Sequence, residues 1–207
     1  MSSTVIRVPK SKIGEPVWAL AELFPSQGEW SEKEYLALET NKLIEFDNGI
    51  LEILPVPNSL HQAIALVFAN LLLASKFGIA GRVLCAPLRL KLADGKYREP
   101  DVLFLLSDND KRYGLEFWTG ADLVVEIVSP GGQARDYTEK RVLYAESGIP
   151  EYWIVDPLTA KITVLKLTGH KYIEHGVFKK GQRATSTLLK GFEVDVSALF
   201  AAGKPRK

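Results

Sequence analysis

Residues 123–128 form an apolar run that a single glutamate, Glu126, interrupts near its centre. A short apolar run bounded by turn residues predicts a buried β-strand. An ionised carboxylate in such a strand costs on the order of several kcal/mol unless a partner compensates it. The compensation comes from a cation, a metal ion or a dense set of hydrogen bonds. Any fold of this chain therefore has to bury this strand and supply a partner for Glu126.

The elements around this strand predict a mixed sheet. A helix is expected over residues 134–147, and a second buried strand follows over residues 152–155. A strand, a crossover helix and a strand make a parallel pair, whereas turn sequences such as Asn48-Gly49 join antiparallel hairpins. The predicted hairpins pair 43–46 with 50–54, 82–92 with 97–106, and 161–167 with 171–175. This order favours an α/β (α+β) fold in which helices flank a central mixed sheet.

Capping residues predict two further helices. Ser31 and Glu34 form a capping box, which marks the start of the first. Ser59 is a good N-cap for a long, mostly apolar helix over residues 60–76, and Gly78 follows it as a stop signal. This second helix is expected to be buried against the sheet.

Composition narrows the class of protein. Of 207 residues, 46% are hydrophobic and 25% are charged, as in a globular domain, and residues 1–29 are expected to form an arm. The net charge of +1 does not support a strong non-specific nucleic-acid binder. Cys85 is the only cysteine, so it forms no internal disulfide, and a cytoplasmic location fits best. The longest apolar stretch, residues 63–74, is too short to span a bilayer, so no membrane partner is expected.

Lys140 lies on the predicted helix that follows Glu126. At about 100° per residue, it falls inside the stripe formed by Tyr137, Leu143 and Tyr144, and this stripe should face the sheet. A lysine in this position either extends its ammonium group to the edge of the sheet or meets buried carboxylates. Both alternatives remain open at the level of the sequence.

Other candidate residues also have structural alternatives. Asp101 opens an apolar run, where a Pro-Asp pair is often only a turn, and Glu99 lies two residues earlier as a competing ligand. Glu52, on the predicted hairpin, can face the solvent, and His61 is more often a packed or capping histidine than a ligand. A neighbouring backbone group or an arginine could likewise satisfy Glu126.

Taken together, Asp101, Glu126 and Lys140 supply the parts of a metal-dependent phosphodiesterase site. Mg²⁺ takes one or two carboxylates together with water and phosphate oxygens, and Mn²⁺ is expected to substitute for it. A bound metal lowers the pKa of water, and a nearby ammonium group orients that water or stabilises charge in the transition state. The three residues together therefore indicate a metal-dependent phosphodiesterase site more specifically than any one of them does alone.

Five stretches carry a resemblance to a known family: 48–54, 99–104, 122–130, 135–144 and 148–157. On these stretches the sequence resembles the Uma-type putative restriction endonucleases, within the PD-(D/E)xK nuclease superfamily. The resemblance covers roughly residues 30–200, which are expected to be the nuclease domain, with residues 201–207 as a tail. The last two stretches, taken together, are quite specific for this family.

The resemblance implies a central mixed sheet flanked by helices and a Mg²⁺-dependent hydrolysis of DNA. It identifies Asp101 as the motif aspartate and Glu126 as the acidic member of (D/E)xK. Val128 stands where the simplest pattern has lysine, so the lysine is expected on the following helix, as Lys140. Glu52 resembles the extra acid that such nucleases bring from an earlier element, and His61 is expected to support it.

A second function remains as an alternative to the nuclease. The chain could be a catalytically inactive nuclease-fold module that binds nucleic acid or protein, and the near-neutral charge agrees with this reading. A buried set of two acids and a lysine argues against it, because an inactive site has no physical reason to keep buried charge. For the nuclease, a homodimer is expected, because two sites related by a two-fold axis suit the two strands of a duplex.

Overall fold

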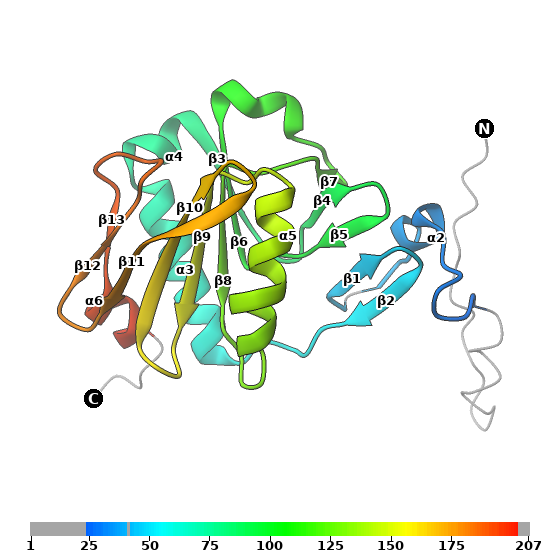
Figure 1. Cartoon of the computed structure of the whole chain (residues 1–207), viewed down its shortest axis with the longest axis horizontal. Coiled ribbons are helices and arrows are strands. Elements are labelled where there is room, and N and C mark those ends of the chain that lie inside the picture. Colours follow the sequence, from blue (N-terminus) through cyan, green and yellow to red (C-terminus); the bar gives the residue numbers. More distant parts are fainter. Residues whose placement is uncertain (1–23, 41, 203–207) are drawn as a thin grey trace.

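The computed structural model of the chain describes residues 24–40 and 42–202, whose arrangement Figure 1 shows. Most of the arm predicted over 1–29 and of the tail predicted over 201–207 lies outside these residues. A six-stranded central sheet and a five-stranded second sheet form most of the described part. The second sheet lies to one side of the central one (Figure 1).

The central sheet is mixed, as predicted. Its spatial order is β11-β10-β9-β8-β6-β3. The strands are β3 (Gly81–Cys85), β6 (Val102–Leu106), β8 (Leu123–Ile127), β9 (Glu151–Asp156), β10 (Lys161–Thr168) and β11 (Lys171–Lys179). Only the pair β8–β9 within this sheet is parallel, because a helical crossover joins the two strands. The predicted parallel pair and the predicted hairpin near residue 170 are confirmed.

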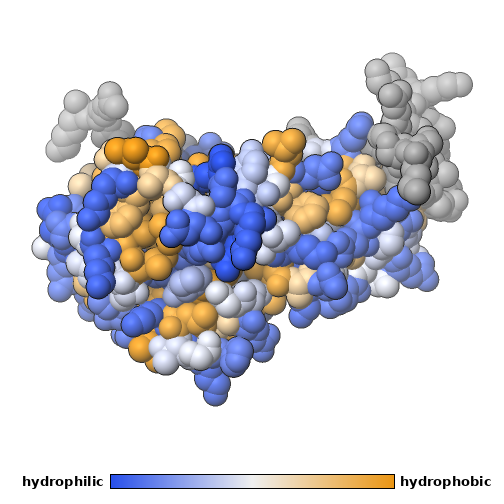
Figure 2. Space-filling model, turned by 90° about the horizontal axis from the view of Figure 1, so that it is seen from above, coloured by the Kyte–Doolittle hydropathy of each residue, from blue (hydrophilic) through white to orange (hydrophobic). Residues whose placement is uncertain are grey.

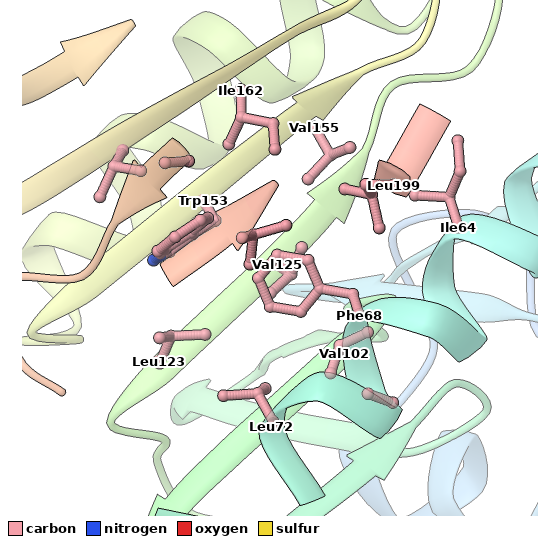
Figure 3. Close-up of a cluster of buried hydrophobic side chains, with 14 of the residues drawn as sticks. Ile64, Phe68, Leu72, Val102, Leu123, Val125, Trp153, Val155, Ile162 and Leu199 are labelled. Atoms are coloured by element: carbon pink, nitrogen blue, oxygen red, sulfur yellow. The ribbon is translucent and has the colours of Figure 1, made fainter. Parts of the chain in front are cut away.

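Helices cover both faces of the central sheet. Helix α3 (Ser59–Leu73) packs on one face, where Phe68 meets the edge of the Trp153 ring at 5.3 Å between centroids (Figure 3). Helix α5 (Lys140–Glu146) packs on the other face with Tyr144, and Figure 1 shows it in front of the sheet. Side chains alternate along a strand, and Val125 of β8 faces α3. Glu126 therefore faces α5.

The second sheet carries the predicted hairpin at Asn48-Gly49. Its order is β2-β1-β5-β4-β7. The strands are β1 (Ile44–Asp47), β2 (Ile50–Ile53), β4 (Arg89–Ala93), β5 (Lys96–Arg98) and β7 (Phe117–Trp118). Asn48 and Gly49 both have positive φ, 47° and 90°, as the tight hairpin turn requires. Helix α2 (Glu32–Leu36) begins at the predicted capping box and buries Tyr35 against Phe46.

Two predicted strands were wrong in length. The prediction of single strands over 82–92 and 97–106 is corrected, because each divides between the two sheets: β3 and β6 belong to the central sheet, and β4 and β5 to the second. Pro87 and Pro100 lie in the breaks. A proline has no N–H to donate to a strand partner, so it interrupts a ladder. Across the first break the apolar residues Ala86 and Leu88 continue the pattern, so periodicity did not reveal it, whereas the second break falls in the polar stretch 98–101.

The predicted helices are also corrected at their ends. Asn58, not Ser59, caps α3, since its side chain accepts a hydrogen bond from the His61 N–H. The helix ends at Leu73 rather than near residue 76, and Ser75 caps a new short helix, α4 (Lys76–Ala80), which contains Gly78. The helix predicted from residue 134 starts there within one residue, but it contains a π-helical turn, η2 (Arg135–Glu139), before it continues as α5 from Lys140.

The C-terminal part, for which the sequence predicted no definite element, packs against β9 and β11. It contains β12 (Arg183–Thr185), β13 (Glu193–Asp195) and α6 (Val196–Ala201). Glu151 of β9 anchors the loop before β13, because its fully buried carboxylate accepts hydrogen bonds from Ser186, Thr187 and Leu188.

Among residues 24–40 and 42–202, no helix is both long and apolar enough to cross a bilayer. Seen from above, the hydrophobic residues form separate patches with hydrophilic residues between them (Figure 2).

Glu32 holds α2 to the second sheet and makes a pH-dependent contribution to stability. Its carboxylate lies 2.6 Å from the Tyr97 hydroxyl and 2.9 Å from Lys91 Nζ, and these partners lower its pKa to about 2. Because the folded-state pKa lies below the unfolded value, the stabilisation is present above about pH 4.5 and is lost as the pH falls towards 2.

We expect Glu32→Gln to lower the free energy of unfolding by roughly 1 kcal/mol at pH 7, a modest figure because the carboxylate is partly exposed to solvent. The difference from the wild type should shrink steadily below pH 4.5. Urea unfolding at pH 7, 5 and 3.5 measures this. A difference that stays constant over this range would contradict the assigned role.

Candidate active site

The register of the central sheet places Asp101 beside Glu126. Val102 pairs with Val125 in the antiparallel ladder of β6 and β8, so Asp101, one residue earlier, lies across from Glu126. The N–H of Ile127 donates to Asp101 Oδ2 at 2.7 Å. His61 Nε2, from the first turn of α3, lies 3.1 Å from the same oxygen. Three elements therefore bring these side chains to one end of the sheet.

Lys140 meets buried carboxylates, which decides between the two alternatives predicted for it. Its Nζ lies 2.7 Å from Glu126 Oε1, and 3.7 Å from both Asp136 Oδ1 and Glu45 Oε1. Only 6% of Lys140 and 3% of Glu126 are exposed. The Tyr144 hydroxyl donates to the same oxygen of Glu126 at 2.5 Å. Glu126 thus has both a cation and a hydrogen-bond donor as partners.

The π-helical turn η2 changes the direction of the side chains before Lys140. Asp136 is buried beside Lys140, whereas Arg135 extends to the hairpin of β1 and β2 and pairs with Glu45 and Glu52. π-Helical turns are rare and occur frequently at functional sites. A wheel drawn at a constant angle per residue cannot represent such a turn, so the sequence did not predict the position of Arg135.

Sequence reasoning also missed Glu45. Only 2% of it is exposed, although it faces Glu52 directly across the hairpin, where like charges repel. Arg135 pairs with both carboxylates, and Arg98 Nε lies 3.3 Å from Glu45. The sequence did contain a signal that Glu45 is buried, because Glu45 interrupts an apolar run at residues 43–46, as Glu126 does in its own strand.

A cavity of about 480 Å³ brings all the predicted site residues together. Its lining includes Glu52, His61, Glu99, Asp101, Glu126, Asp136 and Lys140. These residues do not lie at equal depth: 58% of the Glu52 side chain is exposed, and Arg135 holds its carboxylate. Glu99 is buried in the wall, and no described residue donates a hydrogen bond to its Oε2. Arg89 Nε lies 4.0 Å from Glu99 Oε1.

Burial and neighbouring charge shift the pKa values in this cavity. Burial raises the pKa of Glu126, and the Lys140 ammonium group opposes this shift. Burial alone would lower the pKa of Lys140, but the carboxylates around it outweigh this effect and raise it. Burial also raises the pKa of Glu99, to about 7. Lys140 therefore remains a cation among acidic groups.

The donor set suits a hard cation that keeps part of its water. The ion pair and the hydrogen bond to Glu126 both reach Oε1, and the contacts of Asp101 both reach Oδ2. From the described residues, no hydrogen bond reaches Glu126 Oε2 or Asp101 Oδ1. The described part of the chain also contains no group of three or more His, Cys, Asp or Glu residues arranged to hold a metal ion. Two carboxylates with open oxygens fit Mg²⁺, which usually retains several waters.

Comparison with known proteins agrees with this geometry. The family model of Uma2, described as a putative restriction endonuclease, matches residues 32–197. The chain belongs to the Uma2 family. The matched region includes both sheets and every candidate site residue, so the resemblance predicted from the sequence is confirmed. A search of curated proteins finds no significant match.

A solved structure shares the fold. It is the crystal structure of a putative nuclease belonging to DUF820 from Anabaena variabilis ATCC 29413. The TM-score is 0.69 at 19% sequence identity, and the match covers 84% of this chain and 99% of the other. The predicted fold is thereby confirmed, and family and fold together support a nuclease role.

Proposed function

We propose that this chain is a Mg²⁺-dependent endonuclease that hydrolyses phosphodiester bonds in DNA. One observation carries the proposal: the ammonium group of Lys140 lies 2.7 Å from the buried Glu126 carboxylate, across the strands from Asp101. Two carboxylates can hold a divalent cation, and an ammonium group beside them can stabilise charge on a reacting phosphate. They come from three separate elements and line one cavity.

Asp101 and Glu126 would hold the cation through Oδ1 and Oε2. A bound divalent cation would supply Lewis-acid polarisation of the scissile phosphate and increase the acidity of a water molecule. Lys140 would orient that water or stabilise the negative charge that develops on the phosphate in the transition state. His61 and the Ile127 N–H fix the orientation of Asp101, as outer-shell partners of ligands do.

Two further acids act from the edge of this arrangement. Glu52 would contribute from the rim of the cavity, where Arg135 holds its carboxylate. Glu99 lies in the wall of the cavity, and because burial raises its pKa to about 7, it would contribute a full negative charge only above neutral pH. Mn²⁺ is expected to replace Mg²⁺, because both cations prefer carboxylate and water oxygens. The homodimer and the cytoplasmic location remain predictions.

The alternative function is an inactive module that binds nucleic acid or protein. The net charge of +1 agrees with it. The buried group of Glu45, Glu126, Asp136 and Lys140 argues against it, since buried charges cost desolvation free energy that a binding surface does not need.

The test is cleavage of supercoiled plasmid with Mg²⁺ or Mn²⁺ by the wild type and by Glu126→Gln. We expect the wild type to nick DNA only with metal. The variant should be slower by at least about 100-fold, the size of effect that follows loss of one preorganised electrostatic group.

Glu146→Gln is the matched control, because Glu146 is an exposed acid on the same helix as Lys140. It should cleave as the wild type does. Equal activity of wild type and Glu126→Gln would show that the cleavage does not come from this cavity. A wild type that neither cleaves DNA nor binds Mn²⁺ in calorimetry would favour the inactive module.

A further inference from the structure

Both polar partners of Glu126 converge on one of its two oxygens. Lys140 Nζ lies 2.7 Å and the Tyr144 hydroxyl 2.5 Å from Oε1. The two side chains stand one helical turn apart on α5, so they project from the same face of the helix. A carboxylate oxygen has about two lone-pair sites. Two donors therefore occupy Oε1 and leave Oε2 as the oxygen available to a cation.

Tyr144 is the better fixed of the two donors. It is fully buried, and its ring meets the edge of the Tyr152 ring at 5.1 Å between centroids. The Tyr152 hydroxyl donates in turn to the backbone carbonyl of Asp136 at 2.9 Å, which ties this aromatic pair to the π-helical turn. Lys140, by contrast, has a flexible side chain that three carboxylates surround. The rigid donor determines which way the Glu126 carboxylate is turned.

We propose that Tyr144 is a positioning residue that turns the Glu126 carboxylate so that Oε2 faces the cavity as the cation ligand. The inference rests on the proposed function, and it adds a residue that acts through Glu126 rather than on the substrate. A ligand whose orientation is fixed before binding loses less freedom when the cation arrives. Outer-shell partners of this kind typically change metal affinity or activity by about 10–100-fold.

The test is Tyr144→Phe, which removes only the hydroxyl and keeps the ring packed on Tyr152. Titration calorimetry with Mn²⁺ should show affinity weakened by about 10-fold, and plasmid cleavage should show a similar fall in kcat with KM for DNA unchanged. In the background of Glu126→Gln, the same substitution should cause no further loss of Mn²⁺ affinity. These readouts separate positioning from a role in folding alone.

Tyr172→Phe is the matched control. It removes another buried hydroxyl, which donates to the Ile149 carbonyl at 2.7 Å and does not contact Glu126. It should lower the melting temperature and leave Mn²⁺ affinity and kcat unchanged. If Tyr144→Phe binds Mn²⁺ and cleaves as Tyr172→Phe does, the positioning role is overturned while the nuclease stands. If the wild type neither binds Mn²⁺ nor cleaves, the proposed function is wrong and this inference fails with it.

Discussion

Lys140→Met is expected to abolish DNA cleavage, with a fall of at least about 100-fold, and to retain Mn²⁺ binding. Methionine keeps much of the length of the side chain and removes its charge. Lys140 is not among the proposed ligands, and loss of a positive charge beside Glu126 favours the approach of a cation. Turnover should fall because, among the described residues that line the cavity, no other lysine supplies an ammonium group beside the reacting phosphate.

The same substitution should also lower stability. Lys140 lies within 4 Å of the carboxylates of Glu126, Asp136 and Glu45, which would remain buried without their cation. Removing one partner of a buried ion pair typically costs about 3–5 kcal/mol. Mn²⁺ should recover part of this loss, because a ligand that binds only the folded state stabilises it. Thermal unfolding with and without Mn²⁺ measures the recovery.

Arg141→Met is the control for the loss of one positive charge from the same helix. Arg141 donates to the Tyr172 carbonyl and makes no contact with Glu126. Its variant should cleave DNA at close to the wild-type rate. Wild-type turnover by Lys140→Met would remove Lys140 from the mechanism. Loss of Mn²⁺ binding in that variant would instead indicate that Lys140 maintains the shape of the cation site.

Glu151→Ala is expected to lower the free energy of unfolding by at least about 3 kcal/mol. The Glu151 carboxylate is fully buried and accepts hydrogen bonds from Trp153 Nε1, from the Ser186 and Thr187 hydroxyls, and from the N–H groups of Thr187 and Leu188. Alanine would leave these donors without an acceptor. Each unsatisfied buried donor costs roughly 1–3 kcal/mol, less where water enters the space.

Urea unfolding at pH 7 measures this loss. Hydrogen exchange should show the loop at 186–189 losing protection first, because Glu151 is its anchor on β9. Glu151→Gln is the matched variant: it keeps one acceptor oxygen and should lose less stability than Glu151→Ala. A loss below about 1 kcal/mol in Glu151→Ala would mean that the loop does not depend on this carboxylate.

Much of the candidate site followed from local pattern. Glu126 interrupts an apolar strand, so its burial followed from the sequence, and Lys140 lies in the apolar stripe of the next helix, so its position beside the sheet followed as well. The parallel pair of β8 and β9 followed from the strand–helix–strand order. The hairpin at Asn48-Gly49 followed from turn chemistry. These features depend on residues close together in the chain, where sequence patterns are most informative.

Other features required information from distant parts of the chain. Arg135 and Glu45 form an ion pair although 90 residues separate them, and Arg98 joins the same group from β5. The strands predicted over 82–92 and 97–106 divide between two sheets, although the apolar alternation of the first runs through its break. A period of two describes which side chains share a face of a strand, but it does not identify the sheet that the strand joins.

The sequence by itself determined that Glu126 is buried, that Lys140 lies on the helix covering it, and that helices flank a mixed sheet. The reason is that the local spacing of apolar residues indicates which segments are buried and which face of a helix packs against the sheet. The tertiary structure alone decided that the second sheet brings Glu45 and Glu52 to the π-helical turn, and that Lys140 and Tyr144 share one oxygen of Glu126. These contacts arise only when separate elements pack, because directional ion pairs and hydrogen bonds depend on the relative placement of whole elements.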